Sequence, residues 1–476
     1  MTTLEHVPIE ALSVDRLEPI IGAARATQFE ETAAAARVLL AGRRVVNVNS
    51  TAKGGGVAEL LQTLLAYARG AGIDAQWIAI AGDAPFFTVT KRVHNLLYGA
   101  PGDGGPLDVA EHAHYEDVLR ANAEELLAVI RPEDVVVLHD PQTAGLVPLL
   151  RRVGAPIVWR CHVGRDDPNE HTERGWGFLR PYLDDVDAFV FTRAEFAPPW
   201  VPRDLVHVIP PSIDPFATKN IDLGPDGSYD ILRYVGLVGN GGPPPQTTFV
   251  RRDGSPGRVD RRVDILQTGP PPGPDVPLVV QVSRWDPMKD MAGVMNGFAH
   301  HVDGGTGAHL ALVGPAVHGV ADDPEAASVL EACIEQWRAL PHALRSRIHL
   351  ACVPMHDPDE AAVIVNALQR HATVVVQKSL AEGFGLTVVE AMWKERAVVA
   401  SRVGGIVDQI VDGRDGLLVD DPADLAAFAG VLGGLLGDPD AAARLGAAGR
   451  ARARTDFLPD RHLDQYVELF SHLART

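Results

Sequence analysis

Residues 372–393 constrain the fold more than any other part of the chain. A β-branched run at 372–376 is typical of a buried parallel strand. A turn with Gly383 and Gly385 follows, and the apolar residues from Val388 onward predict the start of a helix. A strand, a glycine turn and a helix place free backbone N–H groups and the positive end of the helix dipole at the carboxyl edge of the sheet. The sequence therefore predicts a phosphate site at this edge.

Two carboxylates frame this turn. Glu382 precedes the glycines and Glu390 follows within the helix, in the spacing E-x7-E. A carboxylate beside an anion repels it, unless the carboxylate binds hydroxyl groups of the same ligand. A sugar diphosphate provides both anionic oxygens for the amides and hydroxyls for the carboxylates. By itself, the spacing is equally compatible with an ordinary strand–turn–helix corner that carries two surface glutamates.

The segment 382–394 resembles the signature of retaining glycosyltransferases with the GT-B fold, of the family 4 type. Within that group it is similar to the trehalose glycosyltransferring synthases and the related retaining trehalose phosphorylases. The resemblance implies that Glu390 binds the ribose hydroxyls of a nucleotide and that Glu382 acts on the transferred sugar. It also implies which backbone amides face the sugar and the diphosphate: those of Gly383, Phe384, Gly385 and Leu386.

Strands and helices alternate in two series, which predicts an α/β fold with two parallel sheets. The strands of the first series are expected at 44–49, 77–80, 135–138, 157–159 and 188–191, and those of the second at 278–282, 309–313, 348–352, 374–376 and 397–400. The resemblance implies the GT-B fold, in which two Rossmann-like doubly wound domains face a cleft.

The expected domain order follows from these series. It comprises an N-terminal helical lead-in at 1–42, an acceptor domain at 43–222, a Gly/Pro-rich linker and insertion at 223–276, a nucleotide-sugar domain at 277–455, and a C-terminal helix at 456–476 that crosses back to the first domain. Within the insertion, residues 247–265 predict a charged hairpin that turns at Asp253 and Gly254.

A glycine loop follows the first strand and precedes a helix with one apolar stripe. Its glycines, Gly54, Gly55 and Gly56, allow a backbone to approach a ligand closely. The pattern is not G-x-G-x-x-G, so it does not indicate a dinucleotide site. The resemblance implies that Gly55 and Gly56 lie against the donor phosphates and the acceptor; a tight packing turn is the alternative.

Two cations follow the first strand of the second series. Arg284 and Lys289 are five residues apart at a strand end, where both can converge on one anion. The resemblance implies that they bind the donor diphosphate and neutralise it as it leaves, which is electrostatic catalysis. No metal is then required, and no histidine or carboxylate group shows the spacing of metal ligands.

Polar residues end two strands of the first series. Asp140 and Gln142 follow one strand, and His162 follows the next. Ligands bind at this edge in open α/β sheets. The resemblance implies that Asp140, Gln142 and His162 contact sugars, with His162 in the catalytic group; a structural role for the histidine is the alternative. The family has an acidic residue where this chain has Gly164, which leaves the acceptor open.

Composition limits the partners. The net charge of -19 and the pI of about 5.3 disfavour nucleic acid and anionic membranes. Three cysteines without pairing or metal spacing fit a reducing cytoplasm, and no signal peptide is visible. A homodimer is one open alternative for the oligomeric state.

The resulting hypothesis is a retaining glucosyltransferase that moves glucose reversibly from a nucleoside diphosphate glucose to glucose, forming trehalose. Retention through a covalent intermediate needs a carboxylate nucleophile, and none is evident, so the resemblance implies front-face substitution. The alternatives are a trehalose phosphorylase that uses inorganic phosphate and a non-catalytic sugar-nucleotide binding protein.

Overall fold

The computed structural model describes residues 4–52, 55–239, 245–302, 304–317 and 325–474. Gly54 of the glycine loop and residues 240–244 of the Gly/Pro-rich insertion lie outside these ranges. The chain forms two compact units. The first comprises Met1–Ile213, Glu382–Phe384 and Phe457–Thr476, and the second comprises Asp214–Ala381 and Gly385–Asp456.

A seven-stranded sheet forms the centre of the first unit. Its strand order is β1-β3-β2-β4-β5-β6-β7. The strands are β1 (Glu5–His6), β2 (Val45–Asn49), β3 (Ala75–Ala79), β4 (Val135–His139), β5 (Ile157–Cys161), β6 (Ala188–Phe191) and β7 (Val206–Val208). All pairings among β2 to β7 are parallel, and only β1 pairs antiparallel, with β3. Every residue of β2, β4, β5 and β6 is buried, as in sheets covered on both faces.

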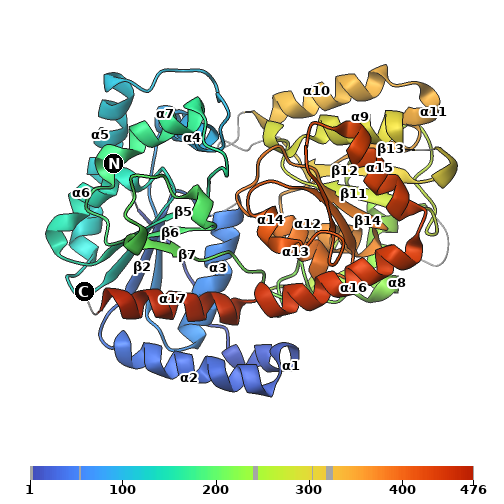
Figure 1. Cartoon of the computed structure of the whole chain (residues 1–476). Helices are drawn as coiled ribbons and strands as arrows, with labels where there is room; N and C mark the ends of the chain where they lie inside the picture. Colours follow the sequence, from blue (N-terminus) through green and yellow to red (C-terminus); the bar gives the residue numbers. More distant parts are fainter. Residues whose placement is uncertain (1–3, 53–54, 240–244, 303, 318–324, 475–476) are drawn as a thin grey trace. The chain divides into compact units, whose positions relative to one another are not determined.

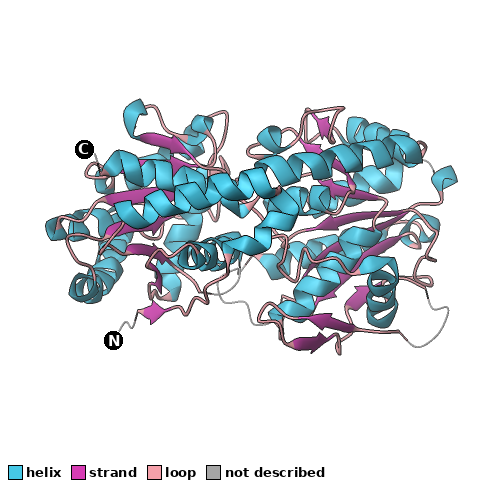
Figure 2. Cartoon of the chain, turned by 90° about the horizontal axis from the view of Figure 1, so that it is seen from below, coloured by secondary structure: helices cyan, strands magenta, loops and turns pink. Residues whose placement is uncertain are grey.

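Helices flank the strands of this unit (Figures 1 and 2). They include α2 (Ala23–Leu39), α3 (Gly55–Gly70), α4 (Ala84–Leu97), α5 (Val109–Val129), α7 (Glu170–Leu179) and α17 (Pro459–Leu473). In α3 the predicted apolar stripe, including Leu61, Leu64 and Leu65, is buried. The final helix, α17, packs against α2 and α3, and Asp460 at its start forms an ion pair with Arg25 of α2.

A second seven-stranded sheet forms the centre of the second unit, in the order β10-β13-β12-β11-β14-β15-β16. Its strands are β10 (Asp264–Leu266), β11 (Leu278–Val282), β12 (His309–Pro315), β13 (Ile348–Val353), β14 (Val374–Gln377), β15 (Ala397–Ser401) and β16 (Leu417–Val419). Only β10 pairs antiparallel, with β13. Its longer helices are α9 (Met291–His301), α10 (Ala326–Ala339), α12 (Pro358–His371), α13 (Leu386–Trp393), α15 (Leu425–Leu436) and α16 (Pro439–Asp456).

The Gly/Pro-rich insertion carries ordered elements. Helix α8 (Gly224–Val235) packs on α12, and β10 extends the second sheet. The predicted hairpin is present but shorter than expected, with β8 (Thr248–Val250) paired to β9 (Pro256–Arg258). Both oxygens of the Asp357 carboxylate, the N-cap of α12, accept bonds from the Arg251 guanidinium at 2.9 and 2.6 Å. The insertion is therefore part of the second unit rather than a bare linker.

The prediction of an α/β chain with two doubly wound parallel sheets is confirmed. All ten predicted strands are present within one or two residues. Within the expected helical lead-in, Glu5 and His6 form the short strand β1. The short edge strands β1, β7, β10 and β16 were missed because two or three residues carry too little periodicity to be recognised.

Helix α16 closely approaches the turn that follows α13. Gly446 of α16 lies so near the turn after α13 that an added Cβ would sit 2.3 Å from the carbonyl oxygen of Glu395, a residue with φ 59°. By contrast, a Cβ added at Gly430 in α15 would have no atom within 4 Å.

Gly446→Ala should therefore destabilise the second unit by roughly 1–3 kcal/mol through overpacking. Gly430→Ala should stabilise it by up to about 1 kcal/mol, because alanine favours helix over glycine. Thermal unfolding of the two variants checks this: Tm should fall for the first and rise or stay unchanged for the second. Equal Tm shifts in both variants would show that the close approach has no consequence.

Candidate functional site

Residues 283–290, the cation loop, follow β11 in the second unit. Asp286 caps the 3-10 turn Pro287–Lys289 by accepting a bond from the Met288 amide at 2.9 Å. Arg284 forms an ion pair with Asp286 at 2.8 Å, and 42% of the arginine side chain remains exposed. Fully buried Trp285 anchors the loop through a 3.0 Å bond from Nε1 to the Pro315 carbonyl. The loop therefore presents cationic groups from a fixed base.

Helix α13 begins beside this loop. Its N-cap, Gly385, has φ 91°, which favours glycine at this position. Strands β11 and β14 pair in parallel, so their carboxyl ends lie at the same edge. The Leu380 amide donates to the Met288 carbonyl at 2.7 Å. The second unit thus brings Arg284, Lys289 and the start of α13 to one edge of the sheet, which is suited to bind an anion.

Glu390 lies in α13, four residues after the first residue of the helix. Only 2% of the residue is exposed. Its Oε1 lies 3.4 Å from Nζ of Lys219, whereas its buried Oε2 has no hydrogen-bond partner among the atoms of the described residues. A buried carboxylate oxygen without a donor is costly. A ligand hydroxyl at this position would satisfy it.

In the first unit, a chain of polar side chains joins three strand ends. His139 Nε2 lies 3.0 Å from Asn47 Oδ1, and His139 Nδ1 lies 3.2 Å from His162 Nε2. With this orientation of the Asn47 amide, His139 donates through Nε2 and His162 donates through its own Nε2. Burial, followed by the charge of Arg160, lowers the pKa of both histidines well below the usual value. Both rings are therefore neutral at pH 7, as a donor–acceptor chain requires.

Asp140 follows His139 in a left-handed conformation, with φ 64°. Its Oδ1 accepts a 2.7 Å bond from the His162 amide, and its carbonyl accepts from Trp159 Nε1 at 3.2 Å. Burial raises the pKa of Asp140 to about 7, against the opposing effects of the His162 bond and the Arg160 charge. Gln142 is half-buried two residues later in the same turn.

Arg160 lies fully buried beneath this group. Its guanidinium donates to Tyr466 and, at 3.1 Å, to the Ile209 carbonyl, and it lies 5.5 Å from the Tyr466 ring centroid. His462 Nε2 lies 3.4 Å away. Helix α17 thus provides side-chain partners for a charge that β5 places inside the sheet.

The other predicted site residues of the first unit lie in the segment Glu382–Phe384 and at the start of α3. By their contacts Glu382–Phe384 belong to this unit, and Glu382 and Phe384 are buried. A Cβ added at Gly383 would sit 2.3 Å from the His162 carbonyl oxygen, so only glycine fits there. Gly55, with φ 76°, and Gly56 are exposed at the start of α3.

The absence of an acidic residue at Gly164 has a structural reason. A Cβ at this position would sit 2.2 Å from Cγ of Phe196, which is buried. The Arg193–Asp166 ion pair, at 3.0 Å, ties the next turn to the same segment. An acidic side chain therefore cannot occupy this position while Phe196 keeps its place.

Sequence reasoning missed four polar residues that support these groups: Asn47, Arg160, Gln281 and Lys378. Each is buried. Asn47, Arg160 and Gln281 interrupt otherwise apolar strands, and Lys378 follows one directly. A polar residue inside a buried strand needs a partner, and that signal could have identified them.

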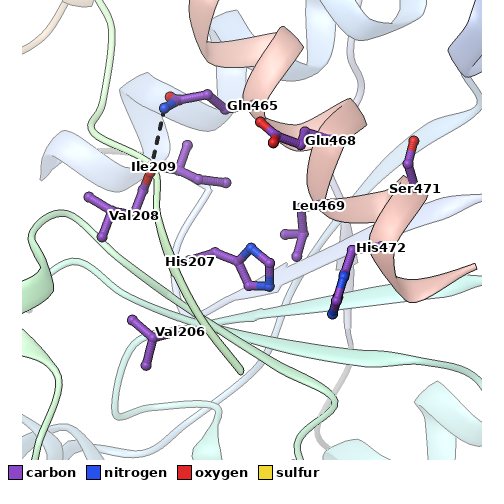
Figure 3. Close-up of a pocket in the computed structure, with 9 residues that line it drawn as sticks. All are labelled: Val206, His207, Val208, Ile209, Gln465, Glu468, Leu469, Ser471 and His472. Atoms are coloured by element: carbon purple, nitrogen blue, oxygen red, sulfur yellow. Dashed lines mark hydrogen bonds between the residues drawn. The ribbon is translucent and has the colours of Figure 1, made fainter. Parts of the chain in front are cut away.

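A separate cavity of about 470 Å³ lies between β7 and α17 (Figure 3). The rings of His207 and His472 face it with centroids 5.6 Å apart, and Gln465 donates to the Val208 carbonyl at its rim. None of the predicted site residues lines it. This cavity is therefore distinct from the strand-end groups described above.

Comparison with known proteins identifies the family. Residues 47–198 match the family model of the trehalose synthase N-terminal domain, and residues 271–452 match that of the glycosyl transferases group 1. A trehalose synthase from Rubrobacter xylanophilus is 36% identical over 441 residues, which cover 91% of each chain. The chain belongs to the trehalose synthase family of glycosyltransferases. The family resemblance predicted from the sequence is confirmed.

Two further comparisons give a less similar relative and a solved structure with a similar fold. A trehalose phosphorylase from Pleurotus pulmonarius is 27% identical over 81% of this chain, but the match covers only 51% of that protein. The solved structure of a trehalose-6-phosphate synthase, OtsA, matches with a TM-score of 0.66 at 14% identity, covering 91% of this chain and 99% of that one. At this identity the match shows the fold alone, and it confirms the GT-B prediction.

Two features are absent from the described residues. Within that part of the chain, no helix is both long enough and apolar enough to cross a membrane. No group of three or more histidine, cysteine, aspartate or glutamate side chains is arranged to hold a metal ion in those same ranges.

The raised pKa of Asp140 predicts a pH-dependent stability. Because the folded state favours the protonated carboxyl, the stability that this group contributes is complete below about pH 4 and is lost as the pH rises to about 7. Asp140→Asn removes this loss. The Tm difference between variant and wild type should therefore be more favourable at pH 8 than at pH 5. The change is equivalent to at most about 3 kcal/mol, because about two pH units of the titration lie above pH 5. The exposed Asp117→Asn is the matched control, and a difference independent of pH in Asp140→Asn would contradict the prediction.

Proposed function

We propose that this enzyme is a retaining glucosyltransferase that moves glucose from a nucleoside diphosphate glucose to glucose and so forms trehalose. The observation that supports the proposal is the edge of the second sheet, at which the parallel strands β11 and β14 end and lead into the cation loop and α13. Glu390, in the same helix, has a buried carboxylate oxygen without a partner among the described residues. Cations and helix amides suit a diphosphate, and a buried carboxylate suits the hydroxyls of a ribose. The family membership supports the same reaction.

In this mechanism the leaving diphosphate is the group that the protein must stabilise. Charge develops on it as the glycosidic bond breaks, and Arg284, Lys289 and the α13 amides would stabilise that charge. Their fixed geometry means that little reorganisation is needed at the moment of reaction. The Glu382 carboxylate would hold hydroxyls of the transferred glucose.

The acceptor side of the proposal rests on the first unit. His162 is neutral, and Asp140 titrates near pH 7, so both can exchange hydrogen bonds with sugar hydroxyls. Retention without a carboxylate nucleophile requires attack from the face that the diphosphate leaves. The leaving phosphate oxygen would then accept the proton of the acceptor hydroxyl.

The first test is substitution at the two charged positions. Arg284→Ala should lower the rate of transfer by about 10²–10³-fold, because one preorganised stabilising group is removed. Glu382→Gln should also lose most of the transfer activity. Release of the nucleoside diphosphate, measured with glucose as acceptor, checks both. Arg258→Ala, which replaces an exposed arginine of the hairpin, is the control. Near-normal rates in both site variants would refute the assignment.

The second test separates the alternatives. Nucleoside diphosphate glucoses assayed with glucose should give trehalose and a nucleoside diphosphate. Turnover of trehalose with inorganic phosphate alone would instead establish the phosphorylase, which the family comparisons make the more distant relative. Nucleotide binding without any turnover would establish a non-catalytic sugar-nucleotide binding protein.

A further inference from the structure

A buried lysine lies beneath the anion-binding edge of the second unit and has no role in the proposed mechanism. Lys378 follows β14 and is fully buried. Its ammonium forms an ion pair with Asp290 and donates to the Pro422 carbonyl at 2.6 Å. Burying a lysine is costly unless its charge is paired. Because Asp290 belongs to the cation loop, the ion pair ties Lys378 to that loop.

Asp290 is the residue on which the loop turns. It follows Lys289 directly and has φ 46°, an uncommon conformation for a residue with a side chain. Its Oδ1 caps α9 by accepting from the Gly293 amide at 3.0 Å, while Oδ2 accepts from Lys378. Substitution is restricted at Gly293, where a Cβ would lie 2.0 Å from Asp290 Oδ2. The lysine therefore stabilises the strained residue that sets the direction of Lys289.

A second connection runs through Gln281 of β11. Its Nε2 donates to the Lys289 carbonyl at 2.7 Å, and its Oε1 accepts from the Lys378 amide at 3.1 Å. Both ends of the short segment from Lys289 to Asp290 are thus tied to the residue that follows β14. These bonds join the cation loop to the same segment that leads into α13.

We infer that Lys378 is a positioning residue, which with Gln281 holds the Lys289 backbone in the orientation that binds the diphosphate of the donor. The inference rests on the proposed function for the identity of the anion. Lys378 is too deeply buried to touch the ligand and acts through Asp290 and the loop. Its loss should weaken the binding of anions while leaving the binding of uncharged sugars unaffected.

The test is Lys378→Met, which retains a long side chain and removes the charge. Binding of ADP, UDP and inorganic phosphate is measured by titration calorimetry, together with binding of trehalose. The affinity for whichever anion the wild type binds should fall at least tenfold, and the affinity for trehalose should change less than twofold. The exposed Arg258→Met, with the same loss of charge, should change neither. Unchanged anion affinity in Lys378→Met would overturn the inference.

The double variant Lys378→Met/Asp290→Asn separates positioning from charge balance. It removes the unpaired carboxylate, so Tm should recover while anion affinity stays low. Recovery of both would show that the lysine only neutralises Asp290. If Lys378→Met does not fold, Gln281→Leu provides the same test, since it breaks the bond to the Lys289 carbonyl and should also lower anion affinity.

The same titrations distinguish this inference from the proposed function. A wild type that binds inorganic phosphate but neither nucleotide would overturn the nucleotide-sugar reaction, and the Lys378 variant must then lose phosphate affinity. A wild type that binds none of the three anions would contradict both.

Discussion

The anion-binding edge of the second unit depends on the electrostatics of one helix start. Gly385 turns the chain through a left-handed conformation so that α13 begins at the carboxyl end of β14. The first amides of a helix have no intrahelical acceptor, and they carry partial positive charge. A sheet edge that adds two cations to this helix end has few chemical uses other than binding a polyanion. The other features of the unit keep these groups in place.

Buried polar bonds provide that rigidity. Thr387 at the start of α13 donates to Gln377 Oε1 at 2.8 Å, and Gln377 in turn donates to Ser379 at 2.9 Å. Such bonds have fixed directions, whereas apolar packing tolerates small rotations. The proposed site would have to meet charge on a short-lived leaving group, which needs this precision. The cost of burying amides and hydroxyls within the sheet is consistent with that proposal.

The first unit also contains buried polar bonds, but between neutral side chains. Asn47, His139 and His162 form a chain in which both ring nitrogens of His139 have a polar partner. Arg160, which has tyrosine, histidine and carbonyl partners, lowers the pKa of both histidines. Neutral imidazoles and a carboxyl that titrates near pH 7 are suited to sugar hydroxyls rather than to phosphate. The neutral polar groups of the first unit therefore suit the uncharged acceptor of the proposed reaction.

The sequence by itself determined the fold class, the strand positions and the main chemical groups. Alternating β-branched runs and amphipathic helices identify a doubly wound sheet because each strand is buried on both faces. Glycines, paired cations and framing carboxylates predict an anion site because their chemistry is local. Only the tertiary structure decided which buried residues support them. Lys378 and Gln281 join segments of neighbouring strands although the two residues are 97 apart in the sequence. Phe196 excludes a side chain at Gly164, and α17 reaches Arg160 across some 300 residues. Such contacts depend on which strands become neighbours, and periodicity along the chain carries no information about that pairing.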